Sequence, residues 1–203
     1  MDSIIDISLI VPCHNLSWYI KPLLLSFDSL YLDKINVEYI FVLDDCTDNT
    51  EDIIRAYMSN INNVQILHCN HHSCGLARNE GLDIAKGEFI WFLDGDDWII
   101  YPYVIRDMLD IMRNENLKIM QLKFVSNFFL REYFSMVWQY IYRKDFIGDT
   151  RFTSVQPNED VIFSKIMLNG LEHIDYYTIP SYFYNYKRPG SNMAQFLEKG
   201  KIE

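Results

Sequence analysis

The sequence predicts an α/β fold in which a mainly parallel central sheet carries helices on both faces. Short, almost wholly apolar runs alternate with amphipathic helical patterns through the first half of the chain, as in parallel strands linked by helices. Apolar residues make up 49% of the 203 residues and aromatic residues 15%, which favours a buried core over disorder. We therefore expect one domain spanning residues 1–203.

The first half contains four apolar runs that we interpret as strands, each followed by a loop. We expect strands over Ile7–Val11, Val37–Leu43, Val64–His68 and Glu88–Leu93, and helices over Ser17–Leu30, Asn49–Ser59 and Gly75–Ala85. Ser17 is a suitable N-cap for the first helix, and Gly87 follows the third. Ligands bind beyond the carboxyl ends of such strands, so the loops that follow them should form a site.

The second half has a less regular pattern. We expect helices over Pro102–Asn114, Asn127–Phe146 and Val161–Leu168, and strands over Leu117–Val125 and Thr178–Tyr186. The segment predicted to be helical over Asn127–Phe146 is rich in aromatic residues. No linker or internal repeat separates the two halves.

Charge and cysteine usage exclude several classes of protein. The net charge of −10 repels phosphate backbones, so no nucleic-acid partner is expected. Acidic residues stand where a signal peptide has basic ones, and the apolar runs are too short for a membrane helix. The four cysteines lie at spacings that fit no zinc or redox motif, which favours free thiols in a cytoplasmic protein: Cys13, Cys46, Cys69 and Cys74.

Three carboxylates surround one glycine where the fourth strand ends. Asp94, Asp96 and Asp97 repel one another unless a cation or ligand neutralises them. Hard divalent cations take carboxylate and phosphate oxygens as ligands. This segment predicts a metal site that holds a phosphorylated substrate, and an acidic solvated turn is the alternative.

Four segments occur in an informative order. They read SLIVPCHN (8–15), FVLDDCTDNT (41–50), GLARNEGLDIAKGEFIWFLDGDDW (75–98) and NEDVIF (158–163). Together they resemble the signatures of family 2 glycosyltransferases, inverting enzymes of the GT-A fold that use nucleotide-diphospho-sugars. The resemblance implies a GT-A-type Rossmann-like sandwich, with residues 1–100 as the nucleotide-sugar-binding half and 101–203 as the acceptor-side half.

The resemblance implies donor-binding roles for residues in the first three segments. It places Pro12, His14 and Asn15 around the nucleobase, although His14 could equally be a polar loop residue. It gives Asp44 and Asp45 to the nucleoside, with Asp45 accepting the N3–H of uracil.

Two arginines are candidates for the diphosphate. Arg78, in the first turn of a predicted helix, could reach it with the help of the helix dipole, and a surface salt bridge is the alternative. Arg188 lies in a segment that resembles the terminal basic motif of many relatives, whose side chain closes on the diphosphate.

The resemblance also implies the metal and catalytic residues. Asp96 is the direct ligand of Mn²⁺ or Mg²⁺, and Asp94 contacts the metal, its water or the ribose. Asp160 is the base that takes the proton of the acceptor hydroxyl, with Glu159 as its neighbour. A capped helix N-terminus is the alternative for this acidic pair, and both roles are compatible.

The sequence departs from the family pattern in two places. Cys46 and Thr47 stand where relatives often carry Gly-Ser, and the chain between Asp97 and Asp160 is short, which puts acceptor binding in doubt. The function implied is transfer of a sugar from a nucleotide donor, a UDP-sugar by preference, to a hydroxyl of a glycan or lipid-linked glycan in the cytoplasm. Peripheral contact with the inner face of a membrane and a homo-oligomer stay open.

The alternatives to glycosyl transfer are a binding or assembly subunit and a nucleotidyltransferase. A nonenzymatic sugar-nucleotide-binding or assembly subunit of a glycan-synthesis complex would suit the short acceptor half and its many aromatic residues. A nucleotidyltransferase would need a glycine-rich phosphate loop after the first strand, and residues 12–15 offer none.

Overall fold

The computed structural model describes residues 4–127, 136–155, 158–186, 188, 189 and 191. The strands are β1 (Ile7–Cys13), β2 (Val37–Asp44), β3 (Val64–Cys69), β4 (Phe89–Phe92), β5 (Trp98–Ile99), β6 (Ile119–Ser126), β7 (Tyr140–Arg143) and β8 (Asp175–Tyr184). The helices are α1 (Lys21–Asp28), α2 (Thr50–Met58), α3 (Cys74–Ile84), α4 (Val104–Asn114), α5 (Lys144–Ile147) and α6 (Glu159–Leu168), with a 3₁₀ turn at Val137–Gln139.

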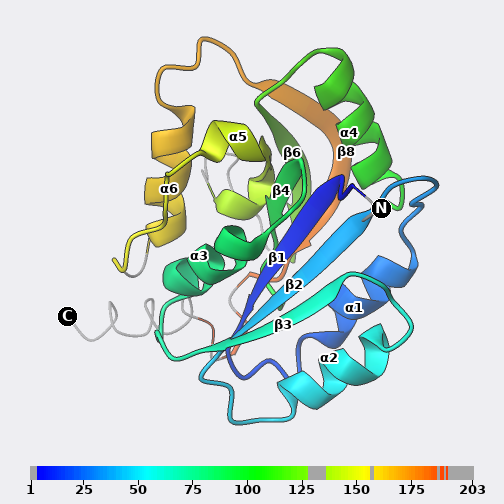
Figure 1. Cartoon of the computed structure of the whole chain (residues 1–203), viewed down its shortest axis with the longest axis vertical. Coiled ribbons are helices and arrows are strands. Elements are labelled where there is room, and N and C mark those ends of the chain that lie inside the picture. Colours follow the sequence, from blue (N-terminus) through cyan, green and yellow to red (C-terminus); the bar gives the residue numbers. More distant parts are fainter. Residues whose placement is uncertain (1–3, 128–135, 156–157, 187, 190, 192–203) are drawn as a thin grey trace.

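All these strands belong to one sheet, in the order β3-β2-β1-β4-β7-β6-β8-β5. Helices α1, α2 and α4 lie on one side of it and α3, α5 and α6 on the other (Figure 1). The predicted α/β fold, with a mainly parallel sheet between two helical layers, is confirmed.

Strict alternation along the strands produces two separate cores. Leu9 of β1 packs in the cluster that contains Phe27 of α1, whereas its neighbour Ile10 packs in the cluster that contains Ala77 of α3 and Phe163 of α6. Burying such a side chain contributes about 1.5–3 kcal/mol each. Because both faces are covered, the strands need apolar residues at every position, which explains their near-continuous apolar runs.

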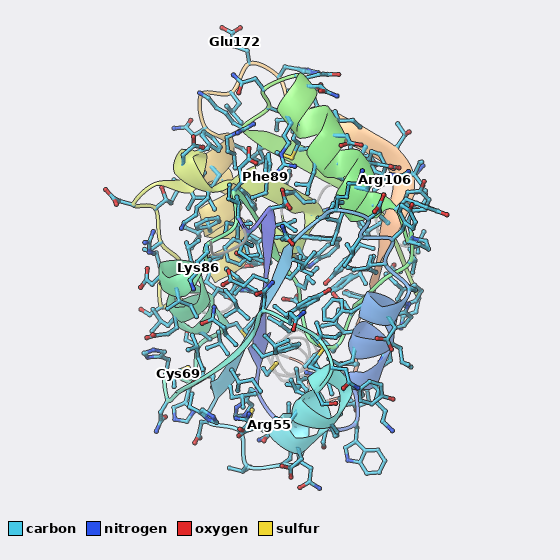
Figure 2. The ribbon with its side chains drawn as sticks, turned by 45° about the vertical axis from the view of Figure 1, so that its right-hand side comes forward. Arg55, Cys69, Lys86, Phe89, Arg106 and Glu172 are labelled. Atoms are coloured by element: carbon cyan, nitrogen blue, oxygen red, sulfur yellow. The ribbon has the colours of Figure 1, made fainter. Side chains whose placement is uncertain are left out.

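The parallel strands end together at one edge of the sheet. Cys13 lies opposite Leu43, and Asp44 lies opposite Cys69, so β1, β2 and β3 finish in step. Figure 2 shows Cys69, at the carboxyl end of β3, at the other end of the sheet from Phe89, where β4 begins. The loops after β1 to β4 therefore meet at the carboxyl edge, as predicted.

The second half inserts antiparallel strands beside β4. β7 pairs antiparallel with β4 and β6, β6 pairs parallel with β8, and β8 pairs antiparallel with β5. The predicted helix over 127–146 is wrong where the structure describes it, because residues 136–146 contain the 3₁₀ turn, β7 and the start of α5. Tyr140, Ile141 and Tyr142 are all buried in the sheet, and continuous burial of this kind suits a helix or a central strand equally in sequence.

Two other boundaries differ from expectation. Ser17 does not cap α1, which begins at Lys21, because the Ser17 N–H donates to Asp48 Oδ2 at 2.9 Å in the neighbouring loop. β5 was not predicted because it has only 2 residues, and Trp98 is held there by stacking on Phe183 at 4.1 Å between ring centroids.

Every helix in the described part of the chain falls short of the length and apolarity needed to span a membrane.

Candidate active site

The acidic turn after β4 places its three carboxylates in different surroundings. The Asp97 N–H donates to the Asp94 carbonyl at 3.1 Å, which closes the turn. The Asp97 side chain points inward, where it is 1% exposed and accepts from the Tyr182 hydroxyl and the Asn185 N–H, each at 2.8 Å. Asp97 therefore fastens the turn to β8, whereas Asp94 and Asp96 remain partly exposed, at 27% and 18%.

Asp96 is paired with Arg188. The Arg188 Nε donates to Asp96 Oδ2, and its guanidinium carbon lies 4.6 Å from the centroid of the Tyr19 ring. Burial raises the pKa of Asp96; Arg188 lowers it, Asp94 raises it, and the net pKa stays above the ordinary value. The charged form of Asp96 is therefore disfavoured in this surrounding, and a bound cation would favour it.

Arg78 joins two of the predicted motifs. Its side chain, on α3, is 3% exposed and donates through Nη2 to Asp94 Oδ1 at 2.7 Å and through Nη1 to Glu159 Oε1 at 3.3 Å. Burial lowers the pKa of Arg78, but the facing carboxylates, Asp94 first, hold it above the ordinary value. The alternative expected for Arg78, a surface salt bridge, is wrong, because the ion pairs of this side chain are buried.

Asp160 lies beside this ion-paired group at the first turn of α6. Burial raises its pKa to about 6; the positive charge of Arg78 opposes the rise, and Glu159 and Asp94 add to it. One of its oxygens, Oδ1, accepts from the Val161 N–H at 2.8 Å in the first turn of the helix, whereas the Asn158 side chain makes no capping hydrogen bond. A carboxylate with this pKa can accept a proton near neutral pH.

The loop after β1 is fixed to the loop after β2. The His14 Nδ1–H donates to the Asp44 carbonyl at 2.7 Å, and Asn15 Oδ1 accepts from the Thr47 N–H at 2.8 Å. Pro12 lies buried within β1 itself, opposite Val42. His14 itself is exposed, which is compatible with base stacking and with a polar loop residue alike.

Asp44 and Asp45 differ sharply although they are neighbours. Asp44 is buried, and its oxygens accept from the N–H groups of His71, His72 and Ser73 at 2.6–3.0 Å. Burial raises the pKa of Asp44, but these backbone donors bring it below its ordinary value. Asp44 therefore holds the loop after β3, whereas the Asp45 side chain is 43% exposed beside His72.

The loops after β1, β2 and β3 each turn at a residue in the left-handed region. Asn15, Asp45 and His72 all have φ of +50°. Asn, Asp and His tolerate this conformation better than other side chains, and strained residues of this kind cluster at ligand sites. The turns bring these side chains to the carboxyl edge.

The oxygen-rich edge fits a hard divalent cation. Asp94 and Asp96 offer carboxylate oxygens, and the pKa of Asp96 lies above its ordinary value because burial and Asp94 disfavour its charge. No group of three or more His, Cys, Asp or Glu side chains within the described ranges is arranged to hold a metal by itself. Phosphate oxygens from a substrate would complete such a site, as is usual for Mg²⁺.

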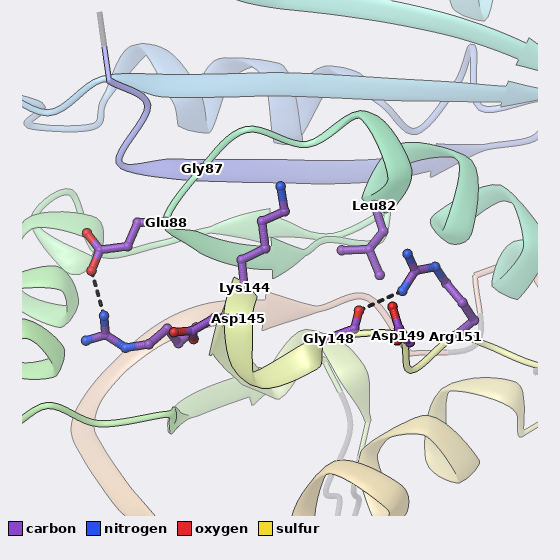
Figure 3. A pocket seen from close by; sticks show the side chains of 9 residues that line it. Leu82, Gly87, Glu88, Lys144, Asp145, Gly148, Asp149 and Arg151 are labelled. Carbon is purple, nitrogen blue, oxygen red and sulfur yellow. Dashed lines mark hydrogen bonds and ion pairs between the residues drawn. The ribbon is translucent and has the colours of Figure 1, made fainter.

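A separate cavity of about 470 Å³ lies at the amino edge, beside the start of β4 (Figure 3). Both arginines of its lining pair with carboxylates: Arg143 binds Glu88 at 2.8 Å, and Arg151 binds Asp83 at 2.9 Å. Neither arginine is free to attract an anion. None of the predicted site residues lines this cavity.

Sequence reasoning missed residues that support the site from a distance in the chain. The Tyr182 hydroxyl and the Asn185 N–H donate to Asp97. The Asn79 side chain donates to the carbonyl of Phe152 and accepts from its N–H. Asn79 follows Arg78 in the ARN segment, which was a signal. Tyr182 lies within a predicted strand and gave none.

A family model described as Glycosyl transferase family 2 matches residues 8–170 of the chain. EpsH of Bacillus subtilis (strain 168) is 38% identical over 97 residues, which cover 48% of this chain and 28% of that protein. Poly(ribitol-phosphate) beta-N-acetylglucosaminyltransferase TarS of Staphylococcus aureus (strain Mu50 / ATCC 700699) is 40% identical over 94 residues, covering 45% of this chain and 16% of TarS. The chain thus spans less than a third of either relative.

Solved structures share the fold over most of the chain. S. aureus TarS 1-349 in complex with UDP-GlcNAc superposes with a TM-score of 0.85 at 23% identity, over 94% of this chain and 61% of that one. The mannosyltransferase PcManGT from Pyrobaculum calidifontis, in complex with GDP-Man and Mn²⁺, superposes with a TM-score of 0.70 at 14% identity, over 97% of this chain and 64% of that one.

Proposed function

The chain belongs to glycosyl transferase family 2, and from this premise we propose that it transfers a sugar, with inversion, from a UDP-sugar to a hydroxyl of a glycan or lipid-linked glycan. The observation that carries the proposal is the ion-paired group at the carboxyl edge. There Arg78 joins Asp94, from the loop after β4, to Glu159, the neighbour of Asp160 on α6. Residues far apart in sequence thus form one acidic site of the kind that this reaction needs.

The loops after β1 and β2 would hold the nucleoside. Pro12 is buried in β1 just before the first loop, and Asn15 fixes that loop to the second. His14 stacks on the base, and the accessible Asp45 accepts the N3–H of uracil. Asp44 contributes indirectly, because its carboxylate fixes the neighbouring loop. The TarS structure, whose partner is UDP-GlcNAc, supports the choice of a uridine donor.

Asp94 and Asp96 would hold Mn²⁺ or Mg²⁺ together with the diphosphate. When bound, the cation supplies Lewis-acid stabilisation of the charge that develops on the departing diphosphate. Arg188 already pairs with Asp96 and is positioned to share that negative charge. The Mn²⁺ in the PcManGT complex supports this cofactor.

Asp160 would act as the base. It removes the proton from the acceptor hydroxyl as that oxygen attacks the anomeric carbon, and the bond from this carbon to the diphosphate oxygen breaks on the opposite face. The pKa of about 6 keeps most of the carboxylate ionised at neutral pH while leaving it basic enough to accept a proton. Glu159 stays bound to Arg78 and fixes the turn.

Substitution of the base tests the proposal directly. Asp160→Asn should lower the rate of sugar transfer, or of donor hydrolysis where no acceptor is supplied, by about 10²- to 10⁴-fold. The affinity for UDP, measured by calorimetry with Mn²⁺, should stay nearly unchanged because Asp160 does not hold the donor. Asp149→Asn, the same change at an exposed residue of the amino edge, is the control and should retain the wild-type rate.

Turnover by the wild-type chain distinguishes an enzyme from a nonenzymatic binding subunit. A nonenzymatic sugar-nucleotide-binding or assembly subunit of a glycan-synthesis complex is the second candidate, because the many aromatic residues of the second half would suit an interface. UDP-sugar binding by the wild-type chain with no turnover, over a panel of glycan acceptors, would favour the subunit. An Asp160→Asn protein as fast as wild type would refute the assigned base.

A further inference from the structure

We propose that Arg78 is a positioning residue, which locks the acidic turn after β4 to the first turn of α6 and contacts no part of the donor. This inference rests on the proposed function and deepens it. It assigns to Arg78 the relative placement of Asp94, at the diphosphate, and Asp160, at the acceptor hydroxyl.

The contacts of the guanidinium carry the inference. One terminal nitrogen binds Asp94 at 2.7 Å and the other binds Glu159 at 3.3 Å, and these carboxylates come from segments that are 16 and 81 residues away in sequence. The fork of a guanidinium can hold two carboxylates in fixed directions, which a lysine ammonium cannot. Asp160 follows Glu159 on α6, so a displacement of Glu159 also moves the base.

A buried apolar contact reinforces this link. Asn79, next to Arg78, binds both the N–H and the carbonyl of Phe152, at 2.9 and 3.0 Å. The Phe152 ring lies 5.5 Å from the Arg78 guanidinium carbon and stacks on Phe163 of α6 at 4.0 Å between centroids. Helix α3 is therefore tied to α6 through charge and through packing.

The first turn of α3 packs closely against Glu159, at the start of α6. A methyl group added at Gly75, in the first turn of α3, would lie 2.8 Å from Glu159 Cγ and 2.9 Å from the Thr153 carbonyl oxygen. Only a glycine permits this approach without displacing α6. The start of α3 is thus fitted directly against the residue that Arg78 binds.

The same geometry argues against direct contact of Arg78 with a diphosphate. The side chain is 3% exposed, and both terminal nitrogens already serve carboxylates. Its Nε has no hydrogen-bond partner among the residues that the structure describes. Leaving this buried donor unpaired is costly, and the two charge-assisted contacts of the terminal nitrogens offset that cost.

The test compares turnover with donor affinity in Arg78→Lys, which keeps the charge and loses the fork. We expect kcat to fall by about 10²-fold, the effect of misplacing a catalytic group by roughly 1 Å. The Kd of UDP with Mn²⁺ should rise by a much smaller factor than kcat falls, because Arg78 contacts no part of the donor and acts on it only through Asp94. Arg151→Lys, the same change in a pair with Asp83 at the amino edge, is the control and should retain the wild-type rate.

Glu159→Gln provides a second route if Arg78→Lys does not fold. It keeps the volume of the side chain and weakens the link from the other end, so it should also lower kcat while leaving KM unchanged. In the double variant, the two decreases in kcat should not add, because each substitution removes the same contact between Arg78 and Glu159. Additive losses would show that the two residues act separately and would overturn the inference.

Other outcomes are equally decisive. A raised KM and a raised Kd of UDP with little change in kcat would mean that Arg78 binds the diphosphate, and the positioning role would be wrong. A wild-type kcat in Arg78→Lys would also overturn it. A wild-type chain that turns over no UDP-sugar would instead refute the proposed function, before any variant is compared.

Discussion

The acidic side chains at the carboxyl edge fall into two groups according to what they touch. Asp44 and Asp97 are buried, and each accepts several hydrogen bonds from neighbouring loops or strands. Asp45, Asp94 and Asp96 keep exposed surface. The first group holds the loops in place, and the second group is available to a donor and a cation.

The titration of Asp160 makes a prediction at the residue scale. Its pKa is raised to about 6, chiefly by burial, so the carboxylate loses its ability to accept a proton as the pH falls through that value. We expect kcat/KM for the UDP-sugar, which reports the free enzyme, to be constant above this pH and to decrease below it. An acidic limb near about 4, the ordinary pKa of an aspartic acid, would contradict the assignment.

Sequence motifs indicate candidate residues for the site but not the partners of those residues. The apolar run before Asp94 and the acidic pair at Asp160 each indicated a functional position. The bond between Arg78 and Glu159 spans 81 residues, and nothing in the local sequence of either residue indicates the other. The Tyr182 contact with Asp97 spans 85 residues and was missed for the same reason.

The elements of the first half were predictable because each obeys one rule throughout. Strands covered on both faces need apolar residues at every position, and the connecting helices need one apolar face. The second half mixes parallel and antiparallel pairing, and β7 looked helical because its aromatic and apolar residues are buried in succession. Its identity depends on pairing with β4 and β6, which local sequence does not encode.

Gly87, between α3 and β4, lies in close contact with the backbone of β1. A Cβ at this position would lie 2.4 Å from the Ser8 backbone nitrogen, and the Gly87 N–H donates to Ser8 Oγ at 2.9 Å. Ser8 Oγ in turn donates to the buried Glu38 at 2.6 Å. Gly87→Ala must push β1 away from the start of β4, so we expect a loss of about 1–3 kcal/mol in the free energy of unfolding, measured with urea.

Lys86→Ala is the matched control for this substitution. Lys86 is exposed, and the hydrogen bond that it makes to Glu38 uses the backbone N–H, which alanine retains. Its free energy of unfolding should lie within about 0.5 kcal/mol of wild type. Equal urea midpoints for Gly87→Ala and Lys86→Ala would contradict the close approach of the two segments.

At the scale of the whole molecule, the two edges of the sheet have different electrostatic character. At the amino edge Arg143 pairs with Glu88 and Arg151 with Asp83. At the carboxyl edge the carboxylates outnumber the cations, and burial raises the pKa of Asp96. In a chain with a net charge of −10, clustering carboxylates at one edge raises their mutual repulsion, which a bound cation would relieve.

The most direct test of this account is the affinity of the wild-type chain for UDP, titrated by calorimetry with Mn²⁺ and again with a chelator in its place. We predict strong binding with Mn²⁺ and binding at least about tenfold weaker without it, because the diphosphate and the carboxylates of Asp94 and Asp96 repel each other unless a cation lies between them. Equal affinities under the two conditions would contradict the account. They would mean that the acidic edge is not a cation-bridged diphosphate site.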